Sequence, residues 1–330
     1  MSASIKALRV AIQTCEIPHP AYVEHLKPLR FRIDDALDGA ASRIERVMGP
    51  SRVGKSMLIN TLQRDFPETR SEGRRRVPLL VVRLETGVSP KLLPSSVLKA
   101  LGLPVQGKLT SAAIYERMVS QLKLAGTRVL IFEEASHLVD HGSRVPPRAA
   151  ADWFKSLAET LDLTLLMFGV PRLERLFACN EQLRLRASAP RHFLPYDSRL
   201  AGDMQAFHTC VATYAKMFRD ACYPIDLSAA ALTYQCYLLT GGLIGVLSRF
   251  MEELAAQMTH TAPRSLNFAD CLAAARAIEA AGSRHCPGFA RPDVIYHEVS
   301  PAFLHQAFVQ VMNDNEFAVP VIRDAEGAFA

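Results

Sequence analysis

The chain has 330 residues, of which 49% are hydrophobic and 22% are charged, and its net charge at pH 7 is +5. This composition excludes a disordered chain, provides for two domains with buried cores, and permits nucleic-acid contact without requiring it. No run of 18 apolar residues occurs and the first ten residues are too mixed in polarity for a signal peptide, so we expect a cytoplasmic protein that contacts no membrane.

The first predicted elements are a strand at residues 43–48 and an amphipathic helix at residues 56–62. The segment between them has the spacing of a phosphate-binding loop, because a glycine and four free positions precede Gly-Lys-Ser. The glycines allow backbone N–H groups to face phosphate oxygens at the start of the helix. We expect Lys55 to lie between the β- and γ-phosphates and Ser56 to coordinate Mg²⁺. The residues expected to bind the nucleotide are Gly49, Pro50, Ser51, Arg52, Val53, Gly54, Lys55, Ser56 and Met57.

Four arginines precede the second predicted strand, at residues 77–82. They are Arg70, Arg74, Arg75 and Arg76. We interpret this cluster as part of a solvated loop in preference to a nucleic-acid patch.

The run at residues 129–134 is apolar up to two carboxylates, Glu133 and Glu134. Such a run fits a central parallel strand, and ligands bind beyond the carboxyl ends of these strands. We therefore expect Glu133, where an aspartate is usual, to contact Mg²⁺, and Glu134 to polarise the attacking water. His137 and His141 follow at a spacing of four, but zinc there would compete with the magnesium role of the acids, so we expect no zinc site.

Strands and helices alternate as far as residue 200, which predicts an α/β/α sandwich around a five-stranded parallel sheet. The remaining elements of this part are helices at 95–101, 112–124, 149–161 and 172–179 and strands at 164–169 and 192–194. Helical periodicity then predicts an all-helical lid, followed by a proline-rich extended tail with one amphipathic piece at 302–312. The expected divisions are an N-terminal extension at 1–40, the nucleotide-binding α/β domain at 41–200, the lid at 201–285 and the tail at 286–330.

Two classes of nucleotide-binding protein do not fit, because the chain lacks the Asn-Lys-x-Asp motif of GTPases and the Leu-Ser-Gly-Gly-Gln motif of ABC ATPases. The remaining pattern resembles that of P-loop AAA+ ATPases. The segment Asn180-Glu181-Gln182-Leu183-Arg184-Leu185-Arg186 is similar to the Asn-x-Gln-Leu-x-x-Arg segment of the TniB/TnsC (MuB-like) family of transposition regulators. The segments at 151–157 and 168–171 are also similar, so the resemblance covers about residues 40–200.

The resemblance implies an ATPase that uses ATP and Mg²⁺, forms a homo-oligomeric ring or helical filament on duplex DNA, and recruits a transposase together with a target-selection protein. It implies that Arg186 reaches into the nucleotide site of a neighbouring protomer and acts in catalysis with Lys55, Glu133 and Glu134. Arg184 is the nearest competitor for this role. In the lid, Arg249 is a candidate nucleotide contact, although an exposed helix arginine is an equal alternative.

In related regulators, DNA contacts come from the interval between the second strand and the acidic strand. Here that interval contains the candidates Lys99, Lys108, Thr110 and Arg117. Two other readings stay open. One is an AAA+ ATPase that loads a helicase or drives a secretion or signalling assembly. The other is a nucleotide-dependent scaffold with negligible hydrolysis, which Glu133 in place of aspartate makes reasonable.

Overall fold

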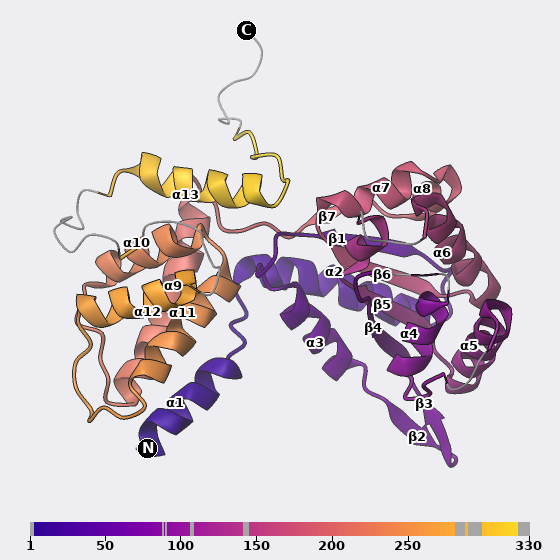
Figure 1. Cartoon of the computed structure of the whole chain (residues 1–330), viewed down its shortest axis with the longest axis horizontal. Helices are drawn as coiled ribbons and strands as arrows, with labels where there is room; N and C mark the ends of the chain where they lie inside the picture. Colours follow the sequence, from indigo (N-terminus) through magenta and orange to yellow (C-terminus); the bar gives the residue numbers. More distant parts are fainter. Residues whose placement is uncertain are drawn as a thin grey trace, which may run out of the picture. The chain divides into compact units, whose positions relative to one another are not determined.

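The computed structural model describes residues 3–87, 89, 91–105, 109–140, 145–280, 288–289 and 299–322. The chain forms two compact units, an α/β unit of Pro20–Leu194 and a helical unit of Met1–His19 with Pro195–Ala330 (Figure 1). The expected divisions at residues 40, 200 and 285 stay a proposal. The structure groups the N-terminal residues differently, because the first helix belongs to the helical unit and the second helix belongs to the α/β unit.

The α/β unit is built on a five-stranded parallel sheet with the strand order β4-β5-β6-β1-β7, which confirms the predicted sheet. Its strands are β1 (Ile44–Met48), β4 (Leu79–Arg83), β5 (Val129–Glu133), β6 (Thr164–Gly169) and β7 (Arg191–His192). Every residue of β1 and β6 is buried, as expected for central strands covered on both faces.

Successive residues of β5 point to opposite faces of the sheet, so their contacts show which helix covers which face. Glu133 points toward α3, where its carboxylate accepts a hydrogen bond from Ser56. Phe132 points the other way and packs against Trp153 and Phe154 of α6.

The helices of this unit are α2 (Pro20–Leu37), α3 (Lys55–Asp65), α4 (Leu92–Ala100), α5 (Ser111–Ala125), α6 (Pro147–Leu161), α7 (Glu174–Ala178) and α8 (Glu181–Arg186), with 3-10 turns η1 (Ala135–Val139) and η2 (Pro171–Leu173).

The arginine-rich segment before β4 is a hairpin, and its prediction as a loop was wrong. Strand β2 (Thr69–Ser71) pairs antiparallel with β3 (Arg74–Arg76). The turn between them consists of Glu72 and Gly73, with φ values of 52° and 73°. Two consecutive positive φ values are what a tight two-residue hairpin turn requires. All six strand residues are exposed, so the expected solvation of the segment is confirmed.

The helical unit confirms the helical region predicted after residue 200. Its helices are α1 (Ala3–Gln13), α9 (Ala201–Asp220), α10 (Ala229–Thr240), α11 (Ile244–Gln257), α12 (Phe268–Ala280) and α13 (Pro301–Asp314). The amphipathic piece predicted at 302–312 corresponds to α13, a regular helix that packs against α10, and Phe289 is buried and stacks on Phe250 at 5.1 Å. Within the described residues, no single helix is long and apolar enough to cross a bilayer, although the bent pair α10 and α11 together meet the criteria of length and composition.

Candidate nucleotide-binding site

The predicted phosphate-binding loop connects β1 to α3, at the carboxyl edge of the sheet. Gly49 is required by its surroundings, because a Cβ at this position would lie 2.4 Å from the carbonyl oxygen of Phe193. Gly54 has φ = 121°, a conformation that residues with a side chain rarely adopt. The loop therefore has the backbone of a phosphate-binding turn, with the N-terminus of α3 behind it.

The side chain of Lys55 lies inside this loop and is 8% exposed as a residue. Its ammonium donates hydrogen bonds to the carbonyl oxygens of Gly49 at 2.7 Å and Pro50 at 2.8 Å. Burial lowers the pKa of Lys55 to about 8, although the charges of Glu134 and Glu133 oppose this shift. A cation held by neutral carbonyl groups in a buried place is well suited to exchange these partners for phosphate oxygens.

Ser56 and Glu133 meet directly across the site. The Ser56 hydroxyl donates to Oε1 of Glu133 at 2.5 Å, a short distance typical of a bond to an ionised carboxylate. Glutamate is one methylene longer than the usual aspartate, and here its carboxylate extends to the hydroxyl itself. A hydroxyl and a carboxylate at hydrogen-bonding distance are hard oxygen donors of the kind that Mg²⁺ prefers, so the residues present fit this ion.

Glu134 follows the last residue of β5 and has the left-handed backbone conformation, with φ = 58°. This conformation is uncommon for a residue other than glycine and places the side chain where a regular strand would not. The turn that follows is fixed, because Nδ1 of His137 lies 2.9 Å from the carbonyl oxygen of Leu84 at the end of β4. His137 therefore has a structural partner, and His141 lies outside the described residues.

The end of β6 supplies no polar side chain of its own, since Met167, Phe168 and Gly169 are buried and carry none. A polar side chain instead reaches the end of β6 from the 3-10 turn η1. Ser136 of η1 is buried, and a Cβ on Gly169 would lie 3.3 Å from its hydroxyl oxygen. Sequence reasoning missed this serine, and the only available signal was its position two residues after Glu134.

The segment that carries the family resemblance forms α8, which attaches to α6 through three polar contacts. Nδ2 of Asn180 donates to Asp152 at 2.6 Å, Lys155 donates to Gln182, and Arg186 forms an ion pair with Glu159 at 2.9 Å. The α6 partners Asp152, Lys155 and Glu159 lie on one helix face, because they are spaced by three and four residues. The two motif segments at 151–157 and 180–186 are therefore parts of one structural unit.

The two arginines of α8 differ in their pairing. The Arg186 side chain is 43% exposed and held by Glu159, whereas the Arg184 side chain is 59% exposed and lies 3.8 Å from Glu181. Between them, Leu185 is 75% exposed. Among the described residues, Arg186 pairs with Glu159 of α6 and Arg184 with Glu181 of α8, and both arginine side chains stay partly exposed, which is compatible with a role in trans.

Arg249 belongs to the helical unit, where it lies in α11 and lines a groove with Arg9, Gln13, Glu252 and Glu253. The phosphate-binding loop belongs to the α/β unit. A contact between Arg249 and the nucleotide stays a prediction.

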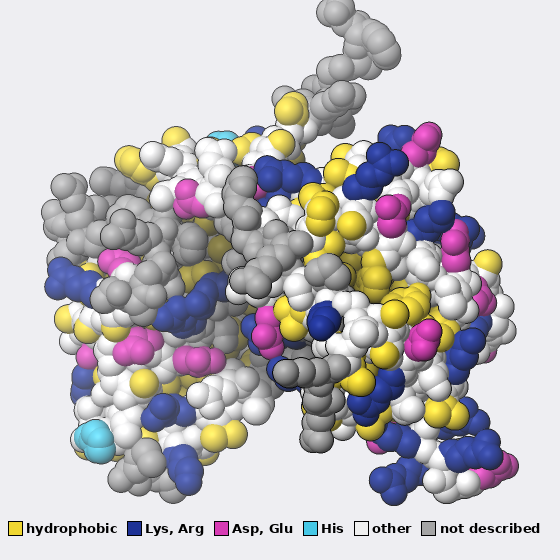
Figure 2. Space-filling model, turned by 45° about the vertical axis from the view of Figure 1, so that its right-hand side comes forward, with side chains coloured by type: hydrophobic (Ala, Val, Ile, Leu, Met, Phe, Trp, Pro, Cys, Tyr) yellow, Lys and Arg dark blue, Asp and Glu magenta, His cyan; other side chains and the backbone are white. Residues whose placement is uncertain are grey.

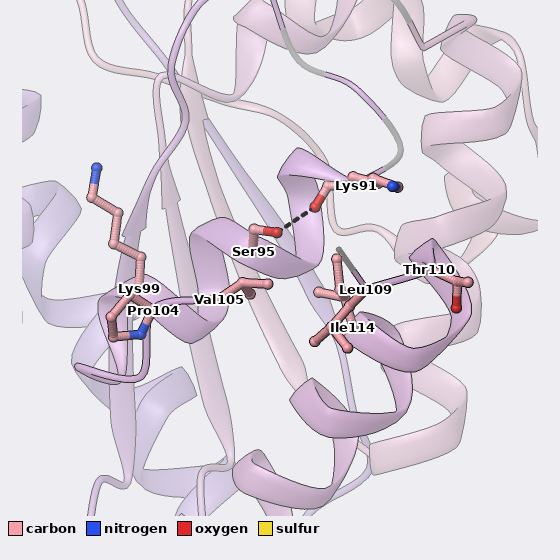
Figure 3. A pocket seen from close by; sticks show the side chains of 8 residues that line it. All are labelled: Lys91, Ser95, Lys99, Pro104, Val105, Leu109, Thr110 and Ile114. Carbon is pink, nitrogen blue, oxygen red and sulfur yellow. Dashed lines mark hydrogen bonds between the residues drawn. The ribbon is translucent and has the colours of Figure 1, made fainter. Parts of the chain in front are cut away.

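Two of the four DNA-binding candidates, Lys99 and Thr110, line an open groove between α4 and α5. Lys99 stands at one end of the groove and Lys91 and Thr110 at the other, with apolar side chains such as Leu109 and Ile114 between them (Figure 3). Lys99 is also paired with Glu85 at 3.0 Å, and the Thr110 hydroxyl caps α5 by accepting from the N–H of Ala113. The structure thus gives Thr110 a structural role.

Lys91 joins the predicted candidates as a residue of the groove, and two predicted candidates, Arg117 and Lys108, remain. Sequence reasoning missed the exposed Lys91, because nothing in its local pattern separates it from other surface lysines. Arg117 is half-buried on α5, and Lys108 lies outside the described residues.

Three solved structures share this fold. The chain is similar to Cdc6p from Pyrobaculum aerophilum (TM-score 0.61, 10% identity, 95% of this chain and 86% of that chain). It is similar to the ORC1 protein of Aeropyrum pernix in complex with DNA (TM-score 0.58, 14% identity, 82% and 69%) and to Drosophila ORC bound to DNA (TM-score 0.52, 12% identity, 97% and 80%). At these identities the likeness shows the fold alone, which is that of P-loop AAA+ ATPases.

No curated protein matches the chain in sequence. The family model described as "Bacterial TniB protein" matches residues 24–194, which is more than half of the chain and includes the phosphate-binding loop, both acids and α8. The chain therefore belongs to the bacterial TniB family.

Proposed function

We propose that this chain is an MgATP-dependent regulator of DNA transposition, which assembles on duplex DNA and recruits and activates a transposase. The MgATP dependence in this proposal rests on the 2.5 Å hydrogen bond between Ser56 and Glu133, beside Lys55, which is held inside a phosphate-binding loop. The part concerning transposition and DNA rests on the family and on the resemblance of the α8 segment.

Each residue of the site has a distinct task in hydrolysis. Backbone N–H groups of the loop bind the phosphates, and the Lys55 ammonium leaves its carbonyl partners to bind the β- and γ-phosphates. Ser56 and Glu133 would hold Mg²⁺, which would neutralise phosphate charge. Glu134, which follows β5 in a left-handed backbone conformation, orients and polarises the attacking water.

Charge on the γ-phosphate is stabilised by an arginine from the adjacent protomer, for which we propose Arg186. Supporting this, α8 presents Arg184 and Arg186 on either side of Leu185, and the partial exposure of all three side chains leaves them accessible to a neighbouring protomer. Assembly would bury Leu185 and release Arg186 from Glu159. A homo-oligomer, as a ring or a helical filament, follows from an arginine that acts in trans.

DNA contact is proposed for the α4–α5 groove, with Lys99, Lys91 and Thr110 at its rim. ORC1 of A. pernix and Drosophila ORC, which share this fold, are in complexes with DNA. Repetition of one or two lysine–phosphate contacts per subunit along an oligomer would suffice for binding that depends strongly on salt and little on sequence.

The test compares steady-state ATP hydrolysis by the wild-type protein and Glu134→Gln, each with and without linear duplex DNA. We expect duplex to stimulate the wild type and the substitution to reduce turnover by about 10²–10⁴-fold while ATP stays bound. Glu24→Gln, on an exposed glutamate of α2, is the matched control and should hydrolyse ATP at the wild-type rate.

Other results would favour the alternatives. Turnover that duplex does not stimulate would favour an ATPase of a helicase-loading, secretion or signalling assembly. Tight ATP binding without turnover in the wild type would favour a scaffold. The observation that gives the scaffold weight is that Glu133 occupies a position where an aspartate is usual, so the carboxylate that would contact the metal ion is one methylene further from the strand.

A further inference from the structure

The β2–β3 hairpin is a charged projection of the α/β unit that the proposed catalytic cycle does not use. Four of the eight residues from Thr69 to Arg76 are arginines, and Figure 2 shows the hairpin as a dense group of dark-blue side chains at the lower right. None of its six strand residues is buried. A two-stranded hairpin without an apolar face is marginally stable by itself, so hydrophobic packing of its own residues does not explain its presence.

The base of the hairpin is fixed to the rest of the unit by two of its arginines. Arg75 donates to the carbonyl oxygen of Leu101, at the end of α4, and binds Glu68 at 2.7 Å. The bond to Arg75 lowers the pKa of Glu68, and the nearby charge of Arg70 also contributes. Arg76 lies against the end of α5, where a Cβ on Gly126 would be 3.0 Å from its Nη1. The hairpin is therefore held in one place by its base.

The other two arginines, Arg70 and Arg74, form no ion pair with any described carboxylate. Arg70 lies directly opposite Arg75 across the hairpin, and Arg74 shares a face with Arg76 because alternate residues point the same way. Like charges at opposed positions destabilise a strand pair. An anion bound to this surface would convert that repulsion into attraction.

We propose that the β2–β3 hairpin binds the phosphate backbone of duplex DNA, as a contact site separate from the α4–α5 groove. This inference rests on the proposed function and extends it to a second surface. The guanidinium group matches phosphate geometry through paired N–H donors, and a two-stranded ribbon is narrow enough to enter a major groove. The hairpin is also continuous with the first candidate surface, since Arg75 binds Leu101 two residues after Lys99.

The test measures the binding of a fluorescent linear duplex by fluorescence anisotropy, with a non-hydrolysable ATP analogue and over a series of salt concentrations. The double variant Arg70→Gln/Arg74→Gln should bind about tenfold more weakly at moderate salt, and its slope of log Kd against log salt should fall by about one to two. The matched control Arg219→Gln/Arg276→Gln removes two exposed arginines of the helical unit and should leave affinity and slope unchanged. Binding of the ATP analogue should be equal in all three proteins.

A third variant gives a result in the opposite direction. Glu72→Asn removes the negative charge at the tip and keeps a residue type that tolerates a positive φ, so DNA affinity should rise by about two- to fivefold if phosphates approach the hairpin. If the hairpin double variant bound duplex as tightly as the wild type, the hairpin contact would be overturned and the proposed function would stay intact. Failure of the wild type to bind duplex at any salt concentration would overturn both.

Discussion

At the scale of single residues, Lys55 is a buried group of the nucleotide site whose charge depends on its surroundings. Its ammonium is buried and bound by two carbonyl oxygens, and burial lowers its pKa to about 8. A bound polyphosphate would favour the charged form and raise this pKa again. Nucleotide affinity and the protonation of Lys55 are therefore linked.

This linkage predicts that ATP affinity has its maximum below pH 8 and falls as the pH rises above 8. The charged lysine is the form that binds phosphate, so each pH unit above about 8 should weaken binding by up to about tenfold, until the pKa of the bound state is reached. Isothermal calorimetry between pH 6.5 and 9.5 measures the effect. Circular dichroism over the same range checks that the fold persists. An affinity that stays constant up to pH 9.5 would show that Lys55 keeps its ordinary pKa.

The residues of this site differ in how well the sequence predicted them. The loop was predictable because glycine and lysine spacing dictates a backbone turn, and Glu133 and Glu134 because they end an apolar run. The direct hydrogen bond from Ser56 to Glu133 was not predictable from the sequence, because it depends on the length of one side chain and on the approach of α3 to β5. Ser136 was missed in the sequence because its spatial neighbour Gly169 is distant in the chain.

At the scale of elements, α8 is a six-residue helix that owes its position to α6. A helix this short is not stable alone in water. It is fixed by buried Leu183, by the three polar contacts with α6, and by its N-cap Asn180, whose side chain accepts from the N–H of Leu183 at 2.9 Å. The position of Arg186 depends on all of these.

Asn180→Ala should therefore affect both stability and hydrolysis. Loss of the cap costs about 1–2 kcal/mol, which corresponds to a decrease in Tm of about 2–8 °C for a unit of this size. ATP hydrolysis should fall while ATP affinity stays the same, because the substitution is remote from the phosphate-binding loop. Glu181→Gln, at an exposed position of the same helix whose ion pair is with Arg184 of α8 itself, is the control and should change Tm by less than about 1 °C. Equal effects of the two substitutions would contradict the cap.

The elements that the sequence predicted well are the long periodic ones. The five strands and α5 were found to within a few residues, because their burial imposes a regular apolar pattern. The β2–β3 hairpin was missed because it buries nothing, so no alternation of apolar residues marks its strands. Its turn signal, Glu72-Gly73, is also weaker than the Asn-Gly or Asp-Gly pairs that usually mark such turns.

At the scale of the whole molecule, the sequence predicted two units but not which helices belong to each. The periodicity of α1 and α2 indicates one apolar face on each helix, and it does not specify which core that face covers. Tyr22 of α2 donates to Thr61 of α3 at 2.6 Å, which places α2 in the α/β unit. Such pairings join residues far apart in the chain and need the folded structure to be identified.

The assembly proposed for the whole molecule predicts complementation between two inactive variants. Arg186→Ala protomers keep the water-polarising Glu134 and lack the arginine, whereas Glu134→Gln protomers lack the carboxylate and keep the arginine. In a head-to-tail oligomer of both at equal concentration, about a quarter of the interfaces combine an intact Glu134 with an intact Arg186. Steady-state hydrolysis of the mixture should therefore recover to about a quarter of the wild-type rate, while either variant alone stays inactive.

The same measurement separates the two candidate arginines. Mixing Arg184→Ala with Glu134→Gln should add little if Arg186 is the residue that acts in trans, because Arg184→Ala protomers would already be active alone. Arg184 is the more exposed of the pair and its carboxylate partner Glu181 is 3.8 Å away, so the opposite result would assign the role to Arg184 and leave Arg186 as the residue that fixes α8 to Glu159. A mixture of Arg186→Ala and Glu134→Gln without any recovery, although both bind ATP and assemble, would mean that no arginine of α8 acts across the interface.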